Sequence, residues 1–196
     1  SGLTPERLAR ILRGAAQGDH LDYLTLAEEM EERDLHYASV LGTRKRAVSG
    51  LDPVVESASD DPKDVDLADW VREQIVDSPQ FGALVDECLD GLGKGYAAVE
   101  IMYARGAQWL PTEYRWRDPK FFQFDLATGR ELRLRDMAAV DGLPLPPYKF
   151  ITHIPRLKSG IPARSGLARL AATAYMCKAY ALTDWLRFAE VFGLPL

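Results

Sequence analysis

The feature that most constrains this chain is a long amphipathic run near its C-terminal end. Between Pro162 and Leu196, apolar residues recur at steps of mostly three and four, the spacing of one face of an α-helix. These residues are Leu167, Leu170, Ala171, Ala174, Tyr175, Ala181, Leu182, Trp185, Phe188, Ala189 and Phe192. Gly193 and Pro195 follow as stop signals. The run predicts one long helix whose aromatic stripe requires a partner surface, and we expect the chain to be a piece of something larger.

The composition is that of a globular protein without a membrane span. The chain has 196 residues, of which 47% are hydrophobic, enough to bury a core in one or two domains. Lys178, Asp184 and Arg187 interrupt the C-terminal run, which falls short of the roughly 20 apolar residues that a bilayer span requires. The N-terminus carries charges where a signal peptide has an apolar core. We therefore expect a protein that is made in a bacterial cytoplasm and has no membrane partner.

The net charge of −5 conceals an asymmetry between the two halves of the chain. Residues 1–100 hold 10 Lys and Arg against 21 Asp and Glu, a net charge of −11. Residues 101–196 hold 14 against 8, a net charge of +6. Two interpretations are open: one half docks on the opposite half of a neighbouring copy, or the two signs cancel within one folded subunit.

Helical patterns dominate the first half. Thr4 is a suitable N-cap before Pro5, and a second amphipathic run extends over residues 23–41. Residues 47–57 have strand-like composition. Beyond an acidic loop, we expect Asp66 to cap one helix.

A further helix and a strand-rich region follow. Ser78-Pro79 restarts the helical pattern, which ends near Gly91. Short alternating runs separated by turn residues then predict an antiparallel meander with a last strand before the basic loop. These runs are residues 96–103, 112–117, 121–125, 131–135 and 148–153.

The order of helices, strands and a final helix predicts an α+β fold. It comprises N-terminal helices, a helical pair, an antiparallel β-meander and a long C-terminal helix. We expect three parts along the chain: an N-terminal helical segment over 1–46, an α+β core over 47–158, and the basic loop with the long helix over 159–196.

The segment Gly91-Leu92-Gly93-Lys94-Gly95 resembles a phosphate-binding loop only superficially. That motif requires a glycine where this chain has Cys88, and a Ser or Thr after the lysine where it has Gly95. The segment also follows a helix and precedes a strand, the reverse of the order that aims a helix N-terminus at phosphate. A helix C-cap and a tight turn explain it better.

Metal ligands and catalytic groups are not arranged in any pattern that we can support. His20, His36 and His153 lie on separate predicted elements without a partner at ligand spacing. The acidic run over residues 60–69 lacks the glycine of a calcium loop. The two Ser-Gly pairs lack the preceding glycine of a nucleophile elbow, as at Ser165. We expect no catalytic residue, no metal and no cofactor.

The two cysteines, Cys88 and Cys177, both lie within apolar helical patterns. A free cysteine is usually buried, and two cysteines are too few for a disulfide framework. We therefore expect both to be reduced, buried thiols.

The best candidate functional patch is the basic loop before the long helix, with Arg156, Lys158 and Arg164. Its cations and free backbone donors suit contact with phosphate, although loop cations more often face an acidic neighbour or solvent. A shorter basic run, Arg44 to Arg46, is more typical of a helix end.

Aromatic and basic residues also alternate in the strand-rich region, which suits either base stacking or an ordinary core-facing sheet. The aromatics are Trp109, Tyr114, Trp116, Phe121, Phe122 and Phe124.

Two segments of the sequence resemble phage portal proteins, in particular those of Mu-like phages and prophages. One is the junction Arg164-Ser165-Gly166-Leu167, a long helix, and then Phe188-Ala189-Glu190-Val191-Phe192-Gly193-Leu194-Pro195. The other is Asp34-Leu35-His36-Tyr37-Ala38-Ser39-Val40-Leu41 followed by Arg44-Lys45-Arg46-Ala47-Val48. The resemblance implies a portal wing-like fold, of which this chain is an N-terminal fragment.

The resemblance also implies a structural role with no reaction of its own. The whole protein would form a head-tail connector, a ring of about twelve subunits at one capsid vertex of the virion. A terminase would package double-stranded DNA through it, and neck and tail proteins would attach to it. Two other hypotheses remain open: a nucleic-acid-processing enzyme whose site is completed by a missing C-terminal half, and a module that binds single-stranded nucleic acid.

Overall fold

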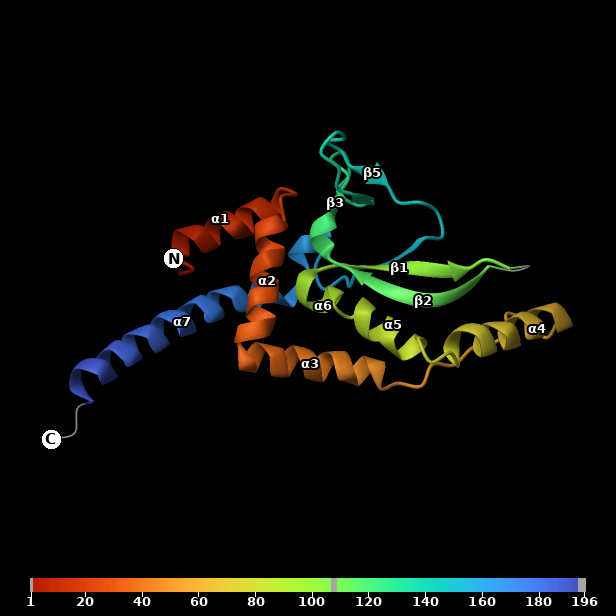
Figure 1. Ribbon diagram of the computed structural model, residues 1–196, viewed down its shortest axis with the longest axis horizontal. Coiled ribbons are helices and arrows are strands. Elements are labelled where there is room, and N and C mark those ends of the chain that lie inside the picture. The colour runs from red at the N-terminus through yellow and green to blue at the C-terminus, as the bar shows by residue number, and fades with distance from the viewer. Residues whose placement is uncertain (1, 107–108, 194–196) are drawn as a thin grey trace.

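The computed structural model describes residues 2–106 and 109–193, and its shape is elongated (Figure 1). Helices and two small sheets form a central body. One helix projects from each end of that body, α4 (Pro62–Val71) on one side and the C-terminal half of α7 (Leu167–Phe192) on the other. The predicted α+β class is confirmed, and so is the long C-terminal helix.

The N-terminal helices are α1 (Pro5–Ala16), α2 (Leu21–Arg33) and α3 (Leu35–Ser49). Thr4 caps α1 as predicted, because its side chain accepts the amide N–H of Arg7 at 3.2 Å. The prediction of one continuous run over 23–41 is wrong. Asp34 adopts an extended conformation, and its carboxylate accepts the amides of His36 and Tyr37 at 3.1 Å each. This side chain ends α2 and starts α3.

Two further boundaries differ from the sequence prediction. Residues 47–57 do not form a strand, because α3 continues to Ser49 and a segment without regular structure follows. The N-cap of α4 is Asp61 rather than Asp66. Asp61 accepts the amide of Lys63 at 2.9 Å and precedes a proline, which suits the first helical position.

A π-helical turn (Arg72–Val76) continues α4. The chain then forms α5 (Phe81–Cys88) and the short α6 (Gly91–Lys94). Gly95 ends α6 with a φ of 104°, a left-handed conformation that favours glycine. The prediction of a helix C-cap and tight turn in this segment is therefore confirmed.

The strands form two separate antiparallel sheets rather than one meander, so that prediction is wrong in its connectivity. The first sheet has the order β2-β1-β6, and the second has the order β3-β4-β5. Asp118, Pro119 and a 3₁₀ turn redirect the chain between them, and a proline cannot donate to a ladder. The strands are β1 (Ala97–Ala104), β2 (Leu110–Arg117), β3 (Phe122–Phe124), β4 (Leu132–Leu134), β5 (Leu143–Pro144) and β6 (Phe150–His153).

The core lies where the N-terminal helices meet both sheets. Tyr23, Met30, Tyr96 and Phe122 are almost completely buried there. His20 connects the elements: its Nδ1 lies 2.9 Å from the carbonyl oxygen of Gly18, and its Nε2 lies 2.9 Å from the Tyr96 hydroxyl. The start of α2 is thereby fixed against the entry into β1.

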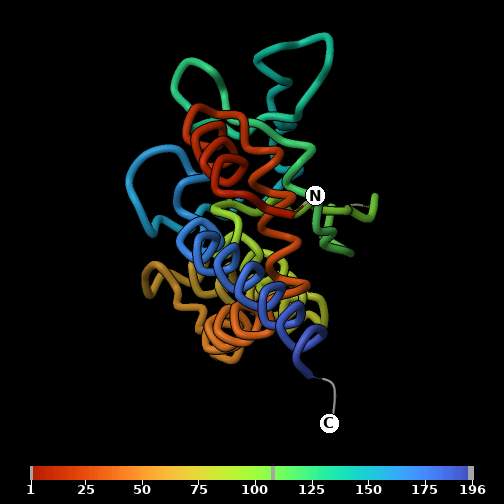
Figure 2. The backbone as a smooth tube through the Cα atoms, turned by 90° about the vertical axis from the view of Figure 1, so that its left-hand side faces the viewer, coloured from red at the N-terminus to blue at the C-terminus, as the bar shows by residue number. Residues whose placement is uncertain are grey.

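The helix α7 crosses α1, α2 and α6 with its N-terminal half and then leaves the body (Figure 2). Ala168, Ala172 and Met176 are its buried residues. Within the described residues, no helix is long and apolar enough to cross a bilayer. Cys177 is exposed, so the prediction of its burial is wrong, whereas Cys88 is half-buried.

Candidate functional site

The loop between β6 and α7 is closed on itself by hydrogen bonds. The Ser165 hydroxyl donates to the carbonyl oxygen of Lys158 at 2.9 Å, and the Ser165 amide donates to Pro162 at 2.8 Å, within the 3₁₀ turn Pro162–Arg164. Gly160 has a φ of 110°, which a side chain rarely adopts. Figure 2 shows this loop, in light blue, at the side of the body.

The turn between β3 and β4 brings a fourth cation, Arg130, to the same place. The Asp125 carboxylate organises that turn by accepting the amides of Thr128, Arg130 and Glu131 at 2.6 to 2.9 Å. These backbone donors hold the pKa of Asp125 well below its usual value. A Cβ placed on Gly129 would lie 3.5 Å from Ile161, so the turn packs directly against the basic loop.

Turn and loop together enclose a hollow of about 570 Å³, which we call the basic hollow. None of the residues that line it is an Asp or a Glu, and Gly160 contributes only its backbone. The polar lining residues are three cations and two serines. They are Arg130, Arg156, Lys158, Ser159 and Ser165. Of the sequence-predicted patch, Arg156 and Lys158 line the hollow, whereas Arg164 does not line it but lies in the same loop between the lining residues Pro162 and Ser165. Arg130 was missed because its proximity depends on a contact between the second sheet and the loop.

Arg164 itself is half-buried. Its Nη1 lies 3.9 Å from where a Cβ of Gly160 would be. Its Nε is one of two buried side-chain polar atoms without a hydrogen-bond partner among the described residues, the other being the Tyr37 hydroxyl. A buried donor without a partner costs free energy, so a partner at this position would be stabilising.

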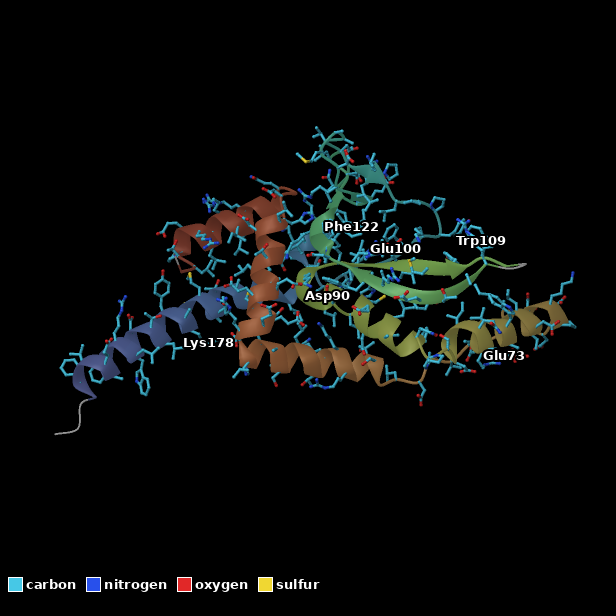
Figure 3. All side chains as sticks on the ribbon, in the orientation of Figure 1. Glu73, Asp90, Glu100, Trp109, Phe122 and Lys178 are labelled. Carbon is cyan, nitrogen blue, oxygen red and sulfur yellow. The ribbon has the colours of Figure 1, made fainter. Side chains whose placement is uncertain are left out.

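Lys94, the lysine of the glycine-rich segment, has an internal structural role. It is 3% exposed, and its Nζ contacts the carboxylates of Asp90, at 2.7 Å, and Glu28. Asp90, labelled in Figure 3, also accepts the indole N–H of Trp116 at 2.9 Å. Burial alone would lower the pKa of Lys94, but the two carboxylates raise it above its usual value. This lysine is not available to a phosphate.

The junction Ser165-Gly166 opens α7 at a point of very close packing. A Cβ on Gly166 would overlap the Tyr23 hydroxyl and the carbonyl oxygen of Gly93, and would lie 2.7 Å from the carbonyl carbon of Lys94. Only glycine fits where α7 passes between α2 and α6.

The other sequence candidates remain apart. His20 is a core residue, whereas His36 and His153 lie on α3 and β6. No group of three potential metal ligands occurs among the residues that the structure describes. The aromatics are divided between the two sheets: Phe122 and Phe124 are buried, whereas Trp109 is 63% exposed at the far end of the first sheet.

Part of the charge asymmetry cancels within the subunit. Glu100 pairs with Lys149 at 2.9 Å and with Arg117, which lowers its pKa despite partial burial. Asp34, the cap of α3, pairs with Lys178 of α7, and this lysine holds the pKa of Asp34 below its usual value. These contacts join the acidic first half to the basic second half, but they do not involve the basic hollow.

The comparisons with known proteins decide the family. A family model described as the portal protein of Mu bacteriophage matches residues 24–196. The chain belongs to that family. It is 33% identical over 200 residues to the "Mu-like prophage FluMu protein gp29" of Haemophilus influenzae, and 33% identical over 201 residues to the "Portal protein" of Escherichia phage Mu. Both alignments cover all of this chain and 38% of the relative, so this portal-family chain is a fragment in comparison with them.

The family match confirms the resemblance that rests on the Asp34 segment and on the Arg164–Leu167 junction. The structure gives both segments a physical role. Asp34 separates two helices and binds α7 through Lys178, and Gly166 permits the closest approach of α7 to the body.

Proposed function

We propose that the full-length protein is a head-tail connector of a Mu-like phage or prophage virion. It forms a ring of about twelve subunits at one capsid vertex, as cyclic symmetry from a heterologous contact allows. A terminase packages double-stranded DNA through the ring, and neck and tail proteins attach to it. The single observation that supports this proposal is the family match over residues 24–196, with relatives that align along the whole chain.

The projecting half of α7 supports an assembled state. Trp185, Phe188 and Phe192 are 70%, 61% and 69% exposed, so of the two possible partner surfaces, one inside this chain and one provided by the rest of the full-length protein, the second is favoured. We include in the proposal that the rest of the full-length protein covers them. An exposed aromatic stripe of this kind is typical of an interaction surface.

Negative-stain images of the full-length protein test the ring directly. Rings with a central hole are expected. Isolated monomers at micromolar concentration and low salt would contradict the proposal. Hydrogen exchange of residues 181–192 provides a second readout: these amides should be protected in the ring and exchange faster in the 196-residue chain.

We further propose that the protein catalyses no reaction of its own and that host-cell synthesis precedes its incorporation into the virion. One observation supports this: Lys94 of the glycine-rich segment forms ion pairs with Asp90 and Glu28, so it is not free to bind a nucleotide phosphate. Purified protein should hydrolyse neither ATP nor DNA. Metal-dependent turnover that disappears on substitution of one acid or histidine would instead favour the nucleic-acid-processing enzyme.

A further inference from the structure

We propose that the basic hollow is a binding site for a phosphate oxyanion. The inference stands on the packing of the β3–β4 turn against the β6–α7 loop, and it goes beyond the proposed role in a ring. It would hold for this chain whether or not the full-length protein assembles.

The first observation is a concentration of cations without counter-ions. Arg130 lines the hollow from the β3–β4 turn, and Arg156 and Lys158 line it from the β6–α7 loop. Arg164 follows in the same loop, and none of these four cations forms an ion pair within residues 2–106 and 109–193. By contrast, the two cations Arg117 and Lys149 both pair with the carboxylate of Glu100 in the first sheet. Like charges at close range repel each other, so an anion in this hollow would stabilise the arrangement.

The second observation is that the nearest acid is already engaged. Asp125 lies in the turn that carries Arg130, but its oxygens accept three backbone amides and the Thr128 hydroxyl, the latter at 2.8 Å. Asp125 is 5% exposed, and the hydrogen bonds of its carboxylate all lie within its own turn. The charge of Asp125 therefore orders the wall of the hollow without occupying it.

The third observation is an unused donor. The Nε of Arg164 is buried without a partner among the described residues, and the Nη1 of the same guanidinium lies 3.9 Å from where a Cβ of the lining residue Gly160 would be. Arg guanidinium groups bind oxyanions through two adjacent N–H groups. The Ser159 side chain lines the same hollow and adds a hydroxyl donor.

The number of donors favours phosphate over a single carboxylate. A phosphate group offers up to two negative charges and several acceptor oxygens, whereas a carboxylate offers one charge and two oxygens. Such a group can come from free phosphate or from the backbone of a nucleic acid, and the chemistry of recognition is the same for both.

The test uses the 196-residue chain with two probes: pyrophosphate, followed by calorimetry, and a fluorescent 20-base-pair DNA duplex, followed by anisotropy across a salt series. Whichever of the two probes binds the parent chain, the double variant Arg156→Gln/Lys158→Gln should bind it at least about tenfold more weakly than the parent does at low salt. If the duplex binds, the salt dependence of its affinity should fall by about 1.8 in log–log slope, since each phosphate contact contributes about 0.9.

A matched control removes the same charge elsewhere. Arg10 and Arg44 are exposed cations on α1 and α3, and Arg10→Gln/Arg44→Gln should leave affinity and slope unchanged. Arg164→Lys keeps the charge but removes Nε, and it should weaken binding while the melting temperature shows that the chain remains folded. Competition assigns the source: pyrophosphate that displaces the duplex indicates free phosphate, whereas a duplex that millimolar pyrophosphate cannot displace indicates a nucleic-acid backbone.

Three outcomes would overturn the proposal. In the first, neither pyrophosphate nor the duplex binds. In the second, the control variant Arg10→Gln/Arg44→Gln weakens binding as much as Arg156→Gln/Lys158→Gln does. In the third, a peptide of residues 56–69, the acidic segment before and within α4, binds in a manner abolished by the loop variant while both phosphate probes fail. That result would assign the hollow to contact between copies of this chain.

Discussion

The two halves of α7 have similar apolar periodicity and opposite surroundings. In the N-terminal half, Ala168, Ala172 and Met176 are buried against the body. In the C-terminal half, Trp185 and Phe192 are exposed. At 100° per residue, Trp185 lies about 180° and Phe192 about 160° around the helix from Met176. The aromatic stripe is therefore a second face on the opposite side of α7, and not an extension of the packed one.

This difference separates two kinds of information in an apolar pattern. Small residues at the packed end allow the backbone of α7 to approach α6 and α2, as Gly166 does at the helix start. Large residues at the projecting end would prevent so close an approach, and they provide area for another surface. Periodicity predicts a helix in both halves, but residue size and angular position distinguish the two environments.

The largest effect is expected from truncation in the core. Phe122 is 1% exposed, and its ring packs edge-to-face against Phe150 with centroids 5.8 Å apart. Phe122→Ala should reduce the free energy of unfolding by about 3 to 5 kcal/mol. Chemical denaturation of the 196-residue chain measures this, with Phe188→Ala on the projecting half of α7 as the control. If Phe122→Ala and Phe188→Ala reduce the free energy of unfolding equally, the projecting half of α7 is as tightly packed as the core, and the contrast drawn above is wrong.

A smaller loss is expected from the buried ion cluster between α2 and α6. Lys94→Met retains much of the side-chain volume but leaves Asp90 and Glu28 without their cation. Loss of one member of a buried pair costs about 3 to 5 kcal/mol, and the partial exposure of Glu28 reduces this to about 2 to 3 kcal/mol. The double variant Lys94→Met/Asp90→Asn should recover part of the loss. No recovery would mean that packing rather than charge is responsible.

The sequence predicted several local features because their causes are local. The cap at Thr4, the glycine turn at Gly95 and the long helix each depend on residues within a few positions of one another. The prediction for Asp66 failed because Asp61 followed by Pro62 provides a stronger helix start slightly upstream. The strand prediction for 47–57 failed because α3 continues further than its apolar pattern suggests.

Features that depend on tertiary contact were not predictable. The division of the strands into two sheets depends on the pairing of β6 with β1, between segments about fifty residues apart. The basic hollow was half-predicted: Arg156, Lys158 and Arg164 are neighbours in sequence, whereas Arg130 joins them only through the Gly129–Ile161 contact. The sequence also did not reveal that Asp34 and Lys178 meet.

A pH-dependent effect is expected from a histidine in the core. Burial, followed by the charge of Arg135, lowers the pKa of His20, although the Gly18 carbonyl and Asp19 oppose the shift. The folded state therefore resists protonation, and stability should fall as the pH decreases below the ordinary histidine value of about 6.5, by at most about 1.4 kcal/mol per pH unit. The variant His20→Gln should show a flatter profile between pH 7 and pH 5. Because burial also lowers the pKa of His153, His153→Gln is the necessary comparison. If the free energy of unfolding of His20→Gln depends on pH as steeply as that of the parent chain, His20 is not the group responsible.

The smallest effect is expected on the projecting half of α7. Trp185 is 70% exposed, so Trp185→Ala in the 196-residue chain removes little buried area and should change the free energy of unfolding by less than about 0.5 kcal/mol. In the full-length protein the same substitution should cost several times more, provided that the aromatic stripe is covered there as proposed. Thermal unfolding of both proteins, each compared with its parent, measures the difference. A large loss in the short chain would show that the stripe folds back onto the body, and equal small losses in both proteins would show that the stripe stays uncovered. Only a loss confined to the full-length protein supports the view that the two faces of α7 serve the subunit and the assembly separately.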